Sequence, residues 1–171
     1  MRAMQVVEVS GKLTLKAAEM PAPKPGKGEV LVRIHAAGVT PTELLWSPTT
    51  QTKAGGVRAL AVPGHEFSGV VEEVGEGVSQ FAAGDAVYGM NDWFAEGATA
   101  EFCIANASSI AAKPARLTHE EAATVPIGAL TAWQGLFTRA KVQPGEESWF
   151  RAVPARSACL SCNLRNCMAR R

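Results

Sequence analysis

The chain has 171 residues, a mass of 18.0 kDa and a formal net charge of +1. A hydrophobic fraction of 47% excludes a wholly disordered chain, and the length is enough for one domain with its own core. The near-neutral charge gives no reason to expect a nucleic-acid partner, and no apolar run reaches the roughly 20 residues of a membrane helix. Because no apolar signal segment follows Met1, we expect a cytoplasmic protein with no membrane partner.

The charge is distributed unevenly along the chain. Residues 1–147 carry 12 Lys and Arg against 16 Asp and Glu, whereas residues 148–171 carry five Arg and no acid. Three of the four cysteines lie in this last segment: Cys159, Cys162 and Cys167. A change of composition this abrupt indicates a boundary near residue 147.

The first two thirds of the chain read as short strands separated by turns. After a β-branched start and a Ser10-Gly11 turn, a proline-rich loop follows at 21–26, and a short helical turn is predicted at 41–46. Residues 47–62 show no clear period. The predicted strands are 5–9, 13–15, 29–39, 67–74, 86–89 and 100–105. This spacing favours a compact barrel or sandwich.

Helices are predicted only late in the chain. Thr118 and Glu121 form the sequence pattern of a capping box, which begins a helix that continues to Val125. Pro126 then suits the first turn of a second helix, which runs to Arg139. Apolar residues recur along it at helical spacing, at 127, 130, 133, 136 and 137.

One dense motif carries a family resemblance. The segment 64–75 reads GHEFSGVVEEVG, and Phe81 with the GDAV run at 84–87 continues it. This pattern resembles the signature of the medium-chain dehydrogenase/reductase family, over about residues 1–146. The resemblance implies a mainly β fold with some helix, a GroES-like barrel of the alcohol dehydrogenase type, at 1–125. The helix at 126–146 would lead toward a Rossmann cofactor domain.

The zinc ligands of that family are incomplete here. Many members hold a catalytic zinc through a cysteine, the histidine of the GHE motif and a second cysteine. By position, Thr40 and Ile127 replace the two cysteines, and residues 90–97 replace the structural zinc lobe. The sequence therefore resembles the zinc-independent quinone oxidoreductase branch, which reduces quinones, enones or similar carbonyls with NADPH, and no metal is expected.

The resemblance also suggests which residues line the cleft between substrate and nicotinamide. Thr40 and Thr131 would border the nicotinamide, whereas His65 with Glu66 is better interpreted as a structural hydrogen-bonded pair than as a catalytic one. Trp133 is interpreted as a core residue. The candidate cleft residues are Thr40, Trp46, His65, Glu66, Asn91, Trp93 and Thr131.

A glycine-rich dinucleotide loop should follow but does not. The run EESWFRAVPARSACLSCNLRNCMARR, from residue 146 to the end, contains no glycine, so it cannot form G-x-G-x-x-G. Moving the reading frame by one nucleotide after residue 146 can produce RVLVPGGAGAVGVFVVQLAQLHGA, an apolar strand, that motif and a helix. We therefore interpret 147–171 as a frameshifted, disordered tail. We expect a chain that is truncated before its cofactor domain, monomeric, inactive alone and without tight NADPH binding.

Two other readings of the tail remain open. The Cys-x2-Cys-x4-Cys spacing is typical of a metal knuckle but lacks a fourth ligand, and the five arginines suit a nucleic-acid arm but lack interleaved aromatic residues. With either reading, the alternative function is a non-enzymatic GroES-like binding module with a basic or metal-binding tail.

Overall fold

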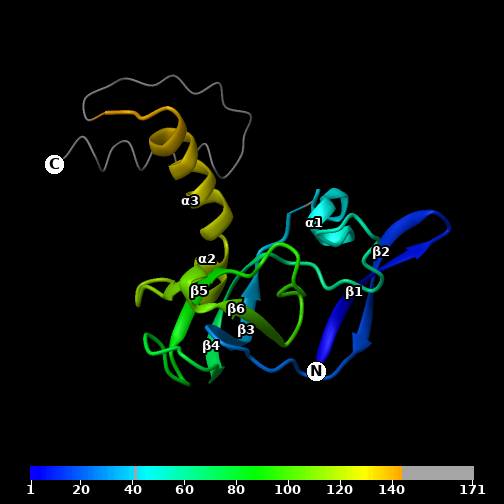
Figure 1. Cartoon of the computed structure of the whole chain (residues 1–171), viewed down its shortest axis with the longest axis horizontal. Helices are drawn as coiled ribbons and strands as arrows, with labels where there is room; N and C mark the ends of the chain where they lie inside the picture. Colours follow the sequence, from blue (N-terminus) through cyan, green and yellow to red (C-terminus); the bar gives the residue numbers. More distant parts are fainter. Residues whose placement is uncertain (41, 144–171) are drawn as a thin grey trace. The chain divides into compact units, whose positions relative to one another are not determined.

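A β-hairpin opens the chain in the computed structural model, which describes residues 1–40 and 42–143. Strands β1 (Arg2–Val9) and β2 (Lys12–Glu19) pair antiparallel, with Val9 opposite Lys12. Ser10 and Gly11 both have positive φ, 52° and 75°, the backbone of a type I′ turn, whose twist matches that of the paired strands. The Ser10-Gly11 turn predicted from the sequence is thus confirmed. Figure 1 shows the hairpin of β1 and β2 that this turn joins.

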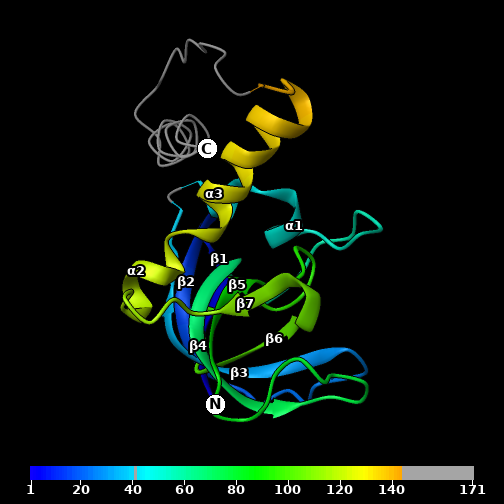
Figure 2. The same ribbon diagram turned by 90° about the vertical axis from the view of Figure 1, so that its left-hand side faces the viewer.

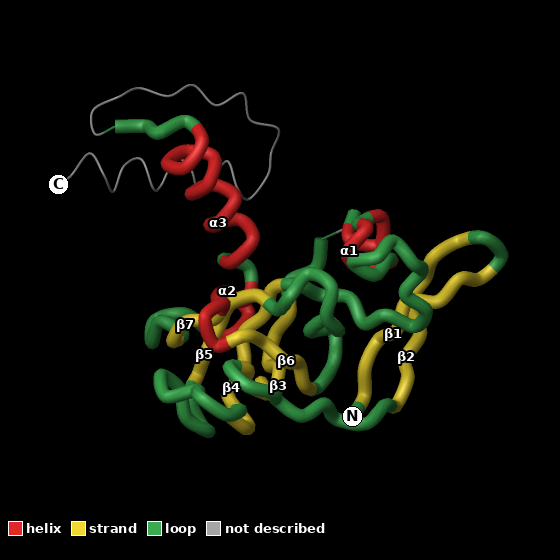
Figure 3. The backbone as a smooth tube through the Cα atoms, in the orientation of Figure 1, coloured by secondary structure: helices red, strands yellow, loops and turns green. Residues whose placement is uncertain are grey.

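A five-stranded antiparallel sheet forms the larger part of the first unit (Figures 2 and 3). Its spatial order is β6-β3-β4-β5-β7. Side chains from its strands make the hydrophobic core, which includes Val30, Val32, Phe67, Val71 and Val87. The strands are β3 (Glu29–Ala37), β4 (Glu66–Val74), β5 (Ala86–Met90), β6 (Phe102–Asn106) and β7 (Ile110–Ala112). The predicted mainly β fold is confirmed.

Backbone contacts join the hairpin to the rest of the first unit. Ala3 bridges Ala100, and the Met4 amide donates to the carbonyl oxygen of Thr99 at 2.9 Å. The Val6 amide donates to Ala61 at 2.8 Å. The hairpin is therefore held along one edge by segments that are distant in sequence.

Helices in the first unit are short. A 3-10 turn (Glu43–Leu45) leads into α1 (Ser47–Thr50), and α2 (His119–Ala123) follows β7. The capping box at α2 is confirmed: Thr118 Oγ1 accepts from the Glu121 amide at 3.2 Å, and Glu121 Oε2 accepts from the Thr118 amide at 2.9 Å. The first unit ends at Thr124.

The second unit begins at Val125. It contains α3 (Pro126–Trp133), with Pro126 in its first turn as predicted, and a π-helical continuation (Gln134–Arg139). The prediction that Trp133 is a core residue is wrong, because 53% of its surface is exposed and its ring contact is with Phe137, centroids 4.7 Å apart. No helix in the described part of the chain is long and apolar enough to cross a membrane. The predicted tail lies outside the described residues.

Two details of the first unit differ from the sequence prediction. Residues 47–62, which lack a clear period, include α1, and the strand β7 was not predicted at all. Both elements are only three or four residues long. Periodicity cannot identify segments of this length, because fewer than two full periods fit within them.

Candidate functional site

His65 is at the centre of a buried polar cluster. It directly precedes β4, only 1% of its surface is exposed, and both ring nitrogens have partners. Nδ1 lies 3.3 Å from Asn91 Oδ1, at the end of β5, and Nε2 lies 3.1 Å from Thr49 Oγ1, on α1. Because a buried polar atom without a partner is costly, these contacts let the imidazole remain inside the domain.

The partners of Asn91 determine the tautomer of His65. Asn91 Nδ2 donates to the carbonyl oxygen of Glu96 at 2.9 Å, so its Oδ1 faces the ring as an acceptor. Nδ1 must then carry the proton, and Nε2 accepts from the Thr49 hydroxyl. Burial lowers the pKa of His65, with Arg58 adding to the effect and the bond to Asn91 opposing it. The ring is therefore neutral at physiological pH.

Glu43 brings a carboxylate to the same cluster. Its Oε1 accepts from the Gly64 amide at 2.5 Å and lies 3.7 Å from His65 Nε2, too far for a hydrogen bond. Burial raises the pKa of Glu43, backbone hydrogen bonds at Gly64 and Thr40 oppose that rise, and the nearby Glu66 adds to it. A carboxyl group beside a neutral imidazole is a place where one proton can be held or passed on.

Glu66, the second residue of the predicted pair, is the first residue of β4 and is also buried. Its backbone carbonyl accepts from the Gly38 amide at 2.9 Å. A Cβ atom on Gly38 would overlap the Glu66 carboxylate. The glycine is therefore needed for close approach between the end of β3 and this side chain.

An aromatic hollow of about 360 Å³ lies beside the cluster and is lined by Trp46, Pro48, Trp93 and Phe94. The Trp93 ring centroid is 4.8 Å from that of His65 and 5.6 Å from that of Trp46. The Trp46 ring lies nearly parallel to His65, with an interplanar angle of 18° and centroids 6.4 Å apart. The hollow thus has flat apolar walls, and two of them, Trp46 and Trp93, lie against the buried imidazole.

Arg58 connects the two chain segments that line this hollow, one containing Pro48 and the other next to Ala95. Its side chain is 8% exposed. Nη1 donates to the carbonyl oxygen of Pro48 at 2.8 Å, and Nη2 donates to that of Ala95 at 3.0 Å. Nη2 also lies 3.0 Å from Glu96 Oε1, while Glu96 Oε2 accepts from the Val62 amide at 2.6 Å. One guanidinium therefore positions the segment of Trp46 against the loop of Trp93.

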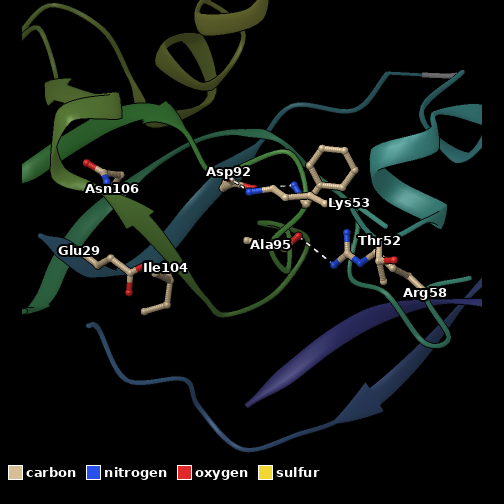
Figure 4. A pocket seen from close by; sticks show the side chains of 9 residues that line it. Glu29, Thr52, Lys53, Arg58, Asp92, Ala95, Ile104 and Asn106 are labelled. Atoms are coloured by element: carbon tan, nitrogen blue, oxygen red, sulfur yellow. Dashed lines mark hydrogen bonds and ion pairs between the residues drawn. The ribbon is translucent and has the colours of Figure 1, made fainter. Parts of the chain in front are cut away.

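A second hollow, of about 490 Å³, shares Phe94 with the aromatic one, and Figure 4 shows its lining side chains. Its charged groups are paired with one another or with the backbone. Lys53 Nζ lies 3.6 Å from Asp92 and 5.6 Å from the centre of the Phe94 ring, and Arg58 is held by Ala95 (Figure 4). Nothing in this arrangement calls for a ligand.

The side chains around His65 do not match a zinc site. Closed or catalytic zinc sites need at least three protein ligands that converge on one point. The described residues contain no group of three or more His, Cys, Asp or Glu arranged in that way. The lone pair of His65 Nε2 is directed at a hydroxyl, and Cys103 is buried with its sulfur 3.3 Å from its neighbour's carbonyl oxygen, on Ile104.

The structure brings most of the predicted cleft residues together. Trp46, Trp93 and Asn91 each lie next to His65 in the first unit. Thr40 is linked to the polar cluster by its backbone carbonyl oxygen, which accepts a hydrogen bond from the Glu43 amide at 2.9 Å. Thr131 belongs to α3 in the second unit, so its place beside the cleft stays a prediction.

Sequence analysis missed four residues of this site. They occur in segments without clear periodicity or outside the family motif: Glu43, Thr49, Arg58 and Glu96. The one signal available was charge, since Glu43 and Arg58 are charged residues among apolar neighbours. Such a position reveals its role only when its long-range partner is known.

Three comparisons with known proteins agree with this fold. The "Alcohol dehydrogenase GroES-like domain" family matches residues 26–137. A quinone oxidoreductase from Mus musculus is 34% identical over 169 residues, which is 96% of this chain and 49% of that protein. "Probable zinc-binding oxidoreductase, mitochondrial" from Arthroderma benhamiae is 39% identical over 135 residues, 79% of this chain and 39% of that protein. A crystal structure of an alcohol dehydrogenase superfamily protein from Novosphingobium aromaticivorans superposes with a TM-score of 0.85 at 30% identity, covering 98% of this chain and 51% of that one.

The antiparallel sheet, the GHE motif at its centre and these matches define a GroES-like β domain of the medium-chain oxidoreductase type. The chain belongs to the alcohol dehydrogenase GroES-like domain family. It spans about half the length of the quinone oxidoreductases that it matches.

Proposed function

We propose that this chain is the acceptor-binding part of a zinc-independent, NAD(P)H-dependent oxidoreductase. The proposed substrates are quinones, enones or similar conjugated carbonyls, which are reduced by hydride transfer. The observation that carries the proposal is the aromatic hollow of Trp46, Pro48, Trp93 and Phe94 beside the neutral His65. The similarity to quinone oxidoreductases supports it.

The hollow suits a flat conjugated acceptor. Its volume lies in the range of small-molecule sites, and indole rings bind planar π-systems by stacking or edge contacts. The buried polar cluster of Glu43, Thr49, His65 and Asn91 lies behind the aromatic walls. This cluster is held by its own hydrogen bonds, and His65 and Glu43 offer atoms that can hold a proton.

The side chains around His65 support the zinc-independent part of the proposal. The carbonyl oxygen of Thr40 accepts a hydrogen bond from the Glu43 amide. The lone pair of His65 Nε2 accepts one from the Thr49 hydroxyl. The relative from Arthroderma benhamiae is named as zinc-binding, which is a statement about that protein. Among residues 1–40 and 42–143 no three ligands converge on one point for a polarising metal, so the acceptor would be oriented by the walls of the hollow.

A bound nicotinamide would supply the hydride, and the protein would supply binding and orientation. Dinucleotide domains are built on parallel strands, whereas all strand pairs in the described part of the chain are antiparallel. We therefore propose that this chain does not bind NADPH tightly and is inactive alone. The roles of Thr40, Glu66 and Thr131 at the cleft, a monomeric state and a cytoplasmic location belong to the same proposal.

Binding of an acceptor tests the central claim. The full chain is titrated calorimetrically with 1,4-naphthoquinone, alongside Trp93→Ala and the control Trp133→Ala, a tryptophan on α3 that is also exposed. We expect weak binding that Trp93→Ala reduces by roughly tenfold and Trp133→Ala leaves unchanged. Equal binding by all three proteins would overturn the assignment of the hollow.

Two further measurements separate the parts of the proposal. Elemental analysis of the full chain should find no stoichiometric zinc, and one tightly held zinc per chain would refute the zinc-independent assignment. Calorimetric titration with NADPH should show no tight binding. Zinc-free protein that binds neither naphthoquinone nor NADPH would favour the alternative, a GroES-like module without enzymatic activity.

A further inference from the structure

A second histidine pair lies away from the candidate cleft and has no part in the proposed reaction. The rings of His35, on β3, and His119, the first residue of α2, stack with centroids 4.4 Å apart and an interplanar angle of 27°. The pair joins a central strand of the sheet to a short helix 84 positions later in the chain. His35 is exposed and His119 is half-buried.

A β-bulge places His35 in this position. Along the β3–β4 pairing, Ile34 is opposite Gly69 and Ala36 is opposite Ser68, so His35 is the extra residue without an opposite partner. Bulges redirect the side chain of the inserted residue and interrupt the regular alternation of the strand. The imidazole of His35 can therefore lie against α2.

Ser68 fixes the other ring. Its hydroxyl is fully buried and donates to the carbonyl oxygen of Val87 at 2.8 Å, and the same oxygen lies 2.7 Å from His119 Nδ1. Because the serine proton is used by Val87, the oxygen must accept from His119, and Nδ1 carries a proton. His119 is thereby held between β4 and the ring of His35.

The charged groups that act on His119 come from three places in the chain. His119 is influenced by His35 from β3, by Lys113 from the segment before α2 and by Glu120 on α2 itself, while β4 presents the Ser68 hydroxyl and β5 the Val87 carbonyl. Burial, then His35 and Lys113, lower the pKa of His119, and Glu120 opposes them. The surroundings therefore disfavour a second positive charge beside the first.

We propose that the His35–His119 stack is a pH-dependent latch, which holds α2 against β3 and β4 while at least one ring is neutral and releases it when both rings are protonated. Two imidazolium ions at stacking distance repel each other, whereas one neutral ring can still stack on a charged one. Release of α2 would affect the end of the first unit, because α2 ends at Ala123, two residues before the second unit begins. The latch therefore acts next to the boundary between the two units.

Hydrogen exchange measured on the full chain tests the latch. The Ala122 and Thr124 amides report on α2, since they donate to Thr118 at 3.0 Å and Glu121 at 3.2 Å, and the amides of Val30–Val32 in β3 serve as an internal reference. Rates are compared at about pH 7.5 and about pH 5, after correction for intrinsic exchange. We expect protection in α2 to fall by roughly tenfold at the lower pH while β3 stays protected.

One variant removes a titrating ring and keeps the stack. His35→Phe, at an exposed position, retains an aromatic ring that can stack on His119, which keeps its hydrogen bond to Ser68. It should keep α2 protected at about pH 5. The proposal is overturned if α2 opens equally in His35→Phe and in the wild type, or if α2 and β3 lose protection together, which would indicate global acid unfolding through His65 instead.

Discussion

Thr49 Oγ1 lies 3.1 Å from His65 Nε2, the nitrogen that carries the lone pair of the buried imidazole. Both side chains are almost completely excluded from solvent. The fold thus uses a threonine of α1, a four-residue helix, to satisfy the histidine of the family motif. The same contact places α1, and with it Trp46 and Pro48, beside the imidazole.

Replacing this threonine should destabilise the domain. Thr49→Val keeps the shape of the side chain but leaves Nε2 of His65 without its donor, and a buried acceptor without a partner costs about 1–3 kcal/mol. Urea unfolding should show this loss. The control is Thr42→Val at an exposed position, which should change stability by less than about 0.5 kcal/mol. Equal stability of both variants would contradict the buried hydrogen bond.

The stability of the domain should also depend on pH. The folded state lowers the pKa values of both His65 and His119, so the unfolded chain binds more protons wherever the pH lies between those values and about 6.5. The free energy of unfolding should therefore be highest above about pH 6.5 and fall as the pH drops through that window. Urea titrations across the pH range would measure it.

The contribution of His119 to this pH dependence can be measured separately from that of His65 with a variant. His119→Asn removes one of the two groups, so its stability should fall less steeply with acid than that of the wild type. Glu43 acts in the opposite sense, because its raised pKa makes the folded state the better proton binder above about pH 4.5. A wild-type stability that rises from neutral pH to about pH 5 would show that Glu43, not the histidines, dominates.

Local sequence signals predicted the elements whose stabilising contacts are local. The capping box at Thr118 and the Ser10-Gly11 turn involve residues within three positions of each other, and both are present. The long apolar run of β3 and the glycine-rich motif of β4 were equally clear, although β3 ends at Ala37, not at Val39. The bulge at His35 was not predicted, because it depends on the register with β4.

The candidate site was predicted in part. The family motif and its positional equivalents identified His65, Trp46, Asn91 and Trp93, and the structure brings these residues together. Arg58 could not be found in this way, because its partners, Pro48 and Ala95, are 10 and 37 positions distant and are backbone carbonyls, which every residue possesses. Trp133 was misassigned because an apolar stripe indicates a helix face without showing that anything covers it.

Gly38 provides a steric test of the cluster. Gly38→Ala should destabilise the domain by about 1–3 kcal/mol, because the added Cβ overlaps the buried Glu66 carboxylate. Gly56→Ala is the matched control, since its Cβ would meet only Thr52 Oγ1 at 3.4 Å on the surface. Thermal unfolding of both variants compares them. A Gly38→Ala protein as stable as Gly56→Ala would show that Glu66 can move aside without loss.

Cys103 should be inert in the folded protein. Burial, with Glu96 adding to the effect, raises the pKa of its thiol to about 12, so the nucleophilic thiolate is scarce at neutral pH. Treatment with iodoacetamide at about pH 8 followed by peptide mass spectrometry should leave Cys103 unmodified. Modification should become rapid after unfolding in guanidinium chloride. Fast labelling of the native chain at this position would contradict the burial of the thiol.

Arg58 should be needed both for stability and for the shape of the aromatic hollow. Arg58→Lys keeps the charge, but an ammonium group cannot reach the carbonyl oxygens of Pro48 and Ala95 with the planar fork of a guanidinium. Loss of buried hydrogen bonds from a charged donor should cost about 1.5–3 kcal/mol in urea unfolding. Arg33→Lys, at a half-exposed ion pair with Glu72, is the matched control and should change stability by less than about 1 kcal/mol.

The same pair of variants links this contact to ligand binding. If Arg58 sets the distance between the segments of Trp46 and Trp93, then Arg58→Lys should weaken naphthoquinone binding even under conditions where the protein remains folded. Arg33→Lys should bind as the wild type does, because Arg33 lies on β3 outside the hollow. Unchanged affinity in a folded Arg58→Lys protein would mean that the walls are positioned independently, by the ring contacts between Trp46, Trp93 and His65.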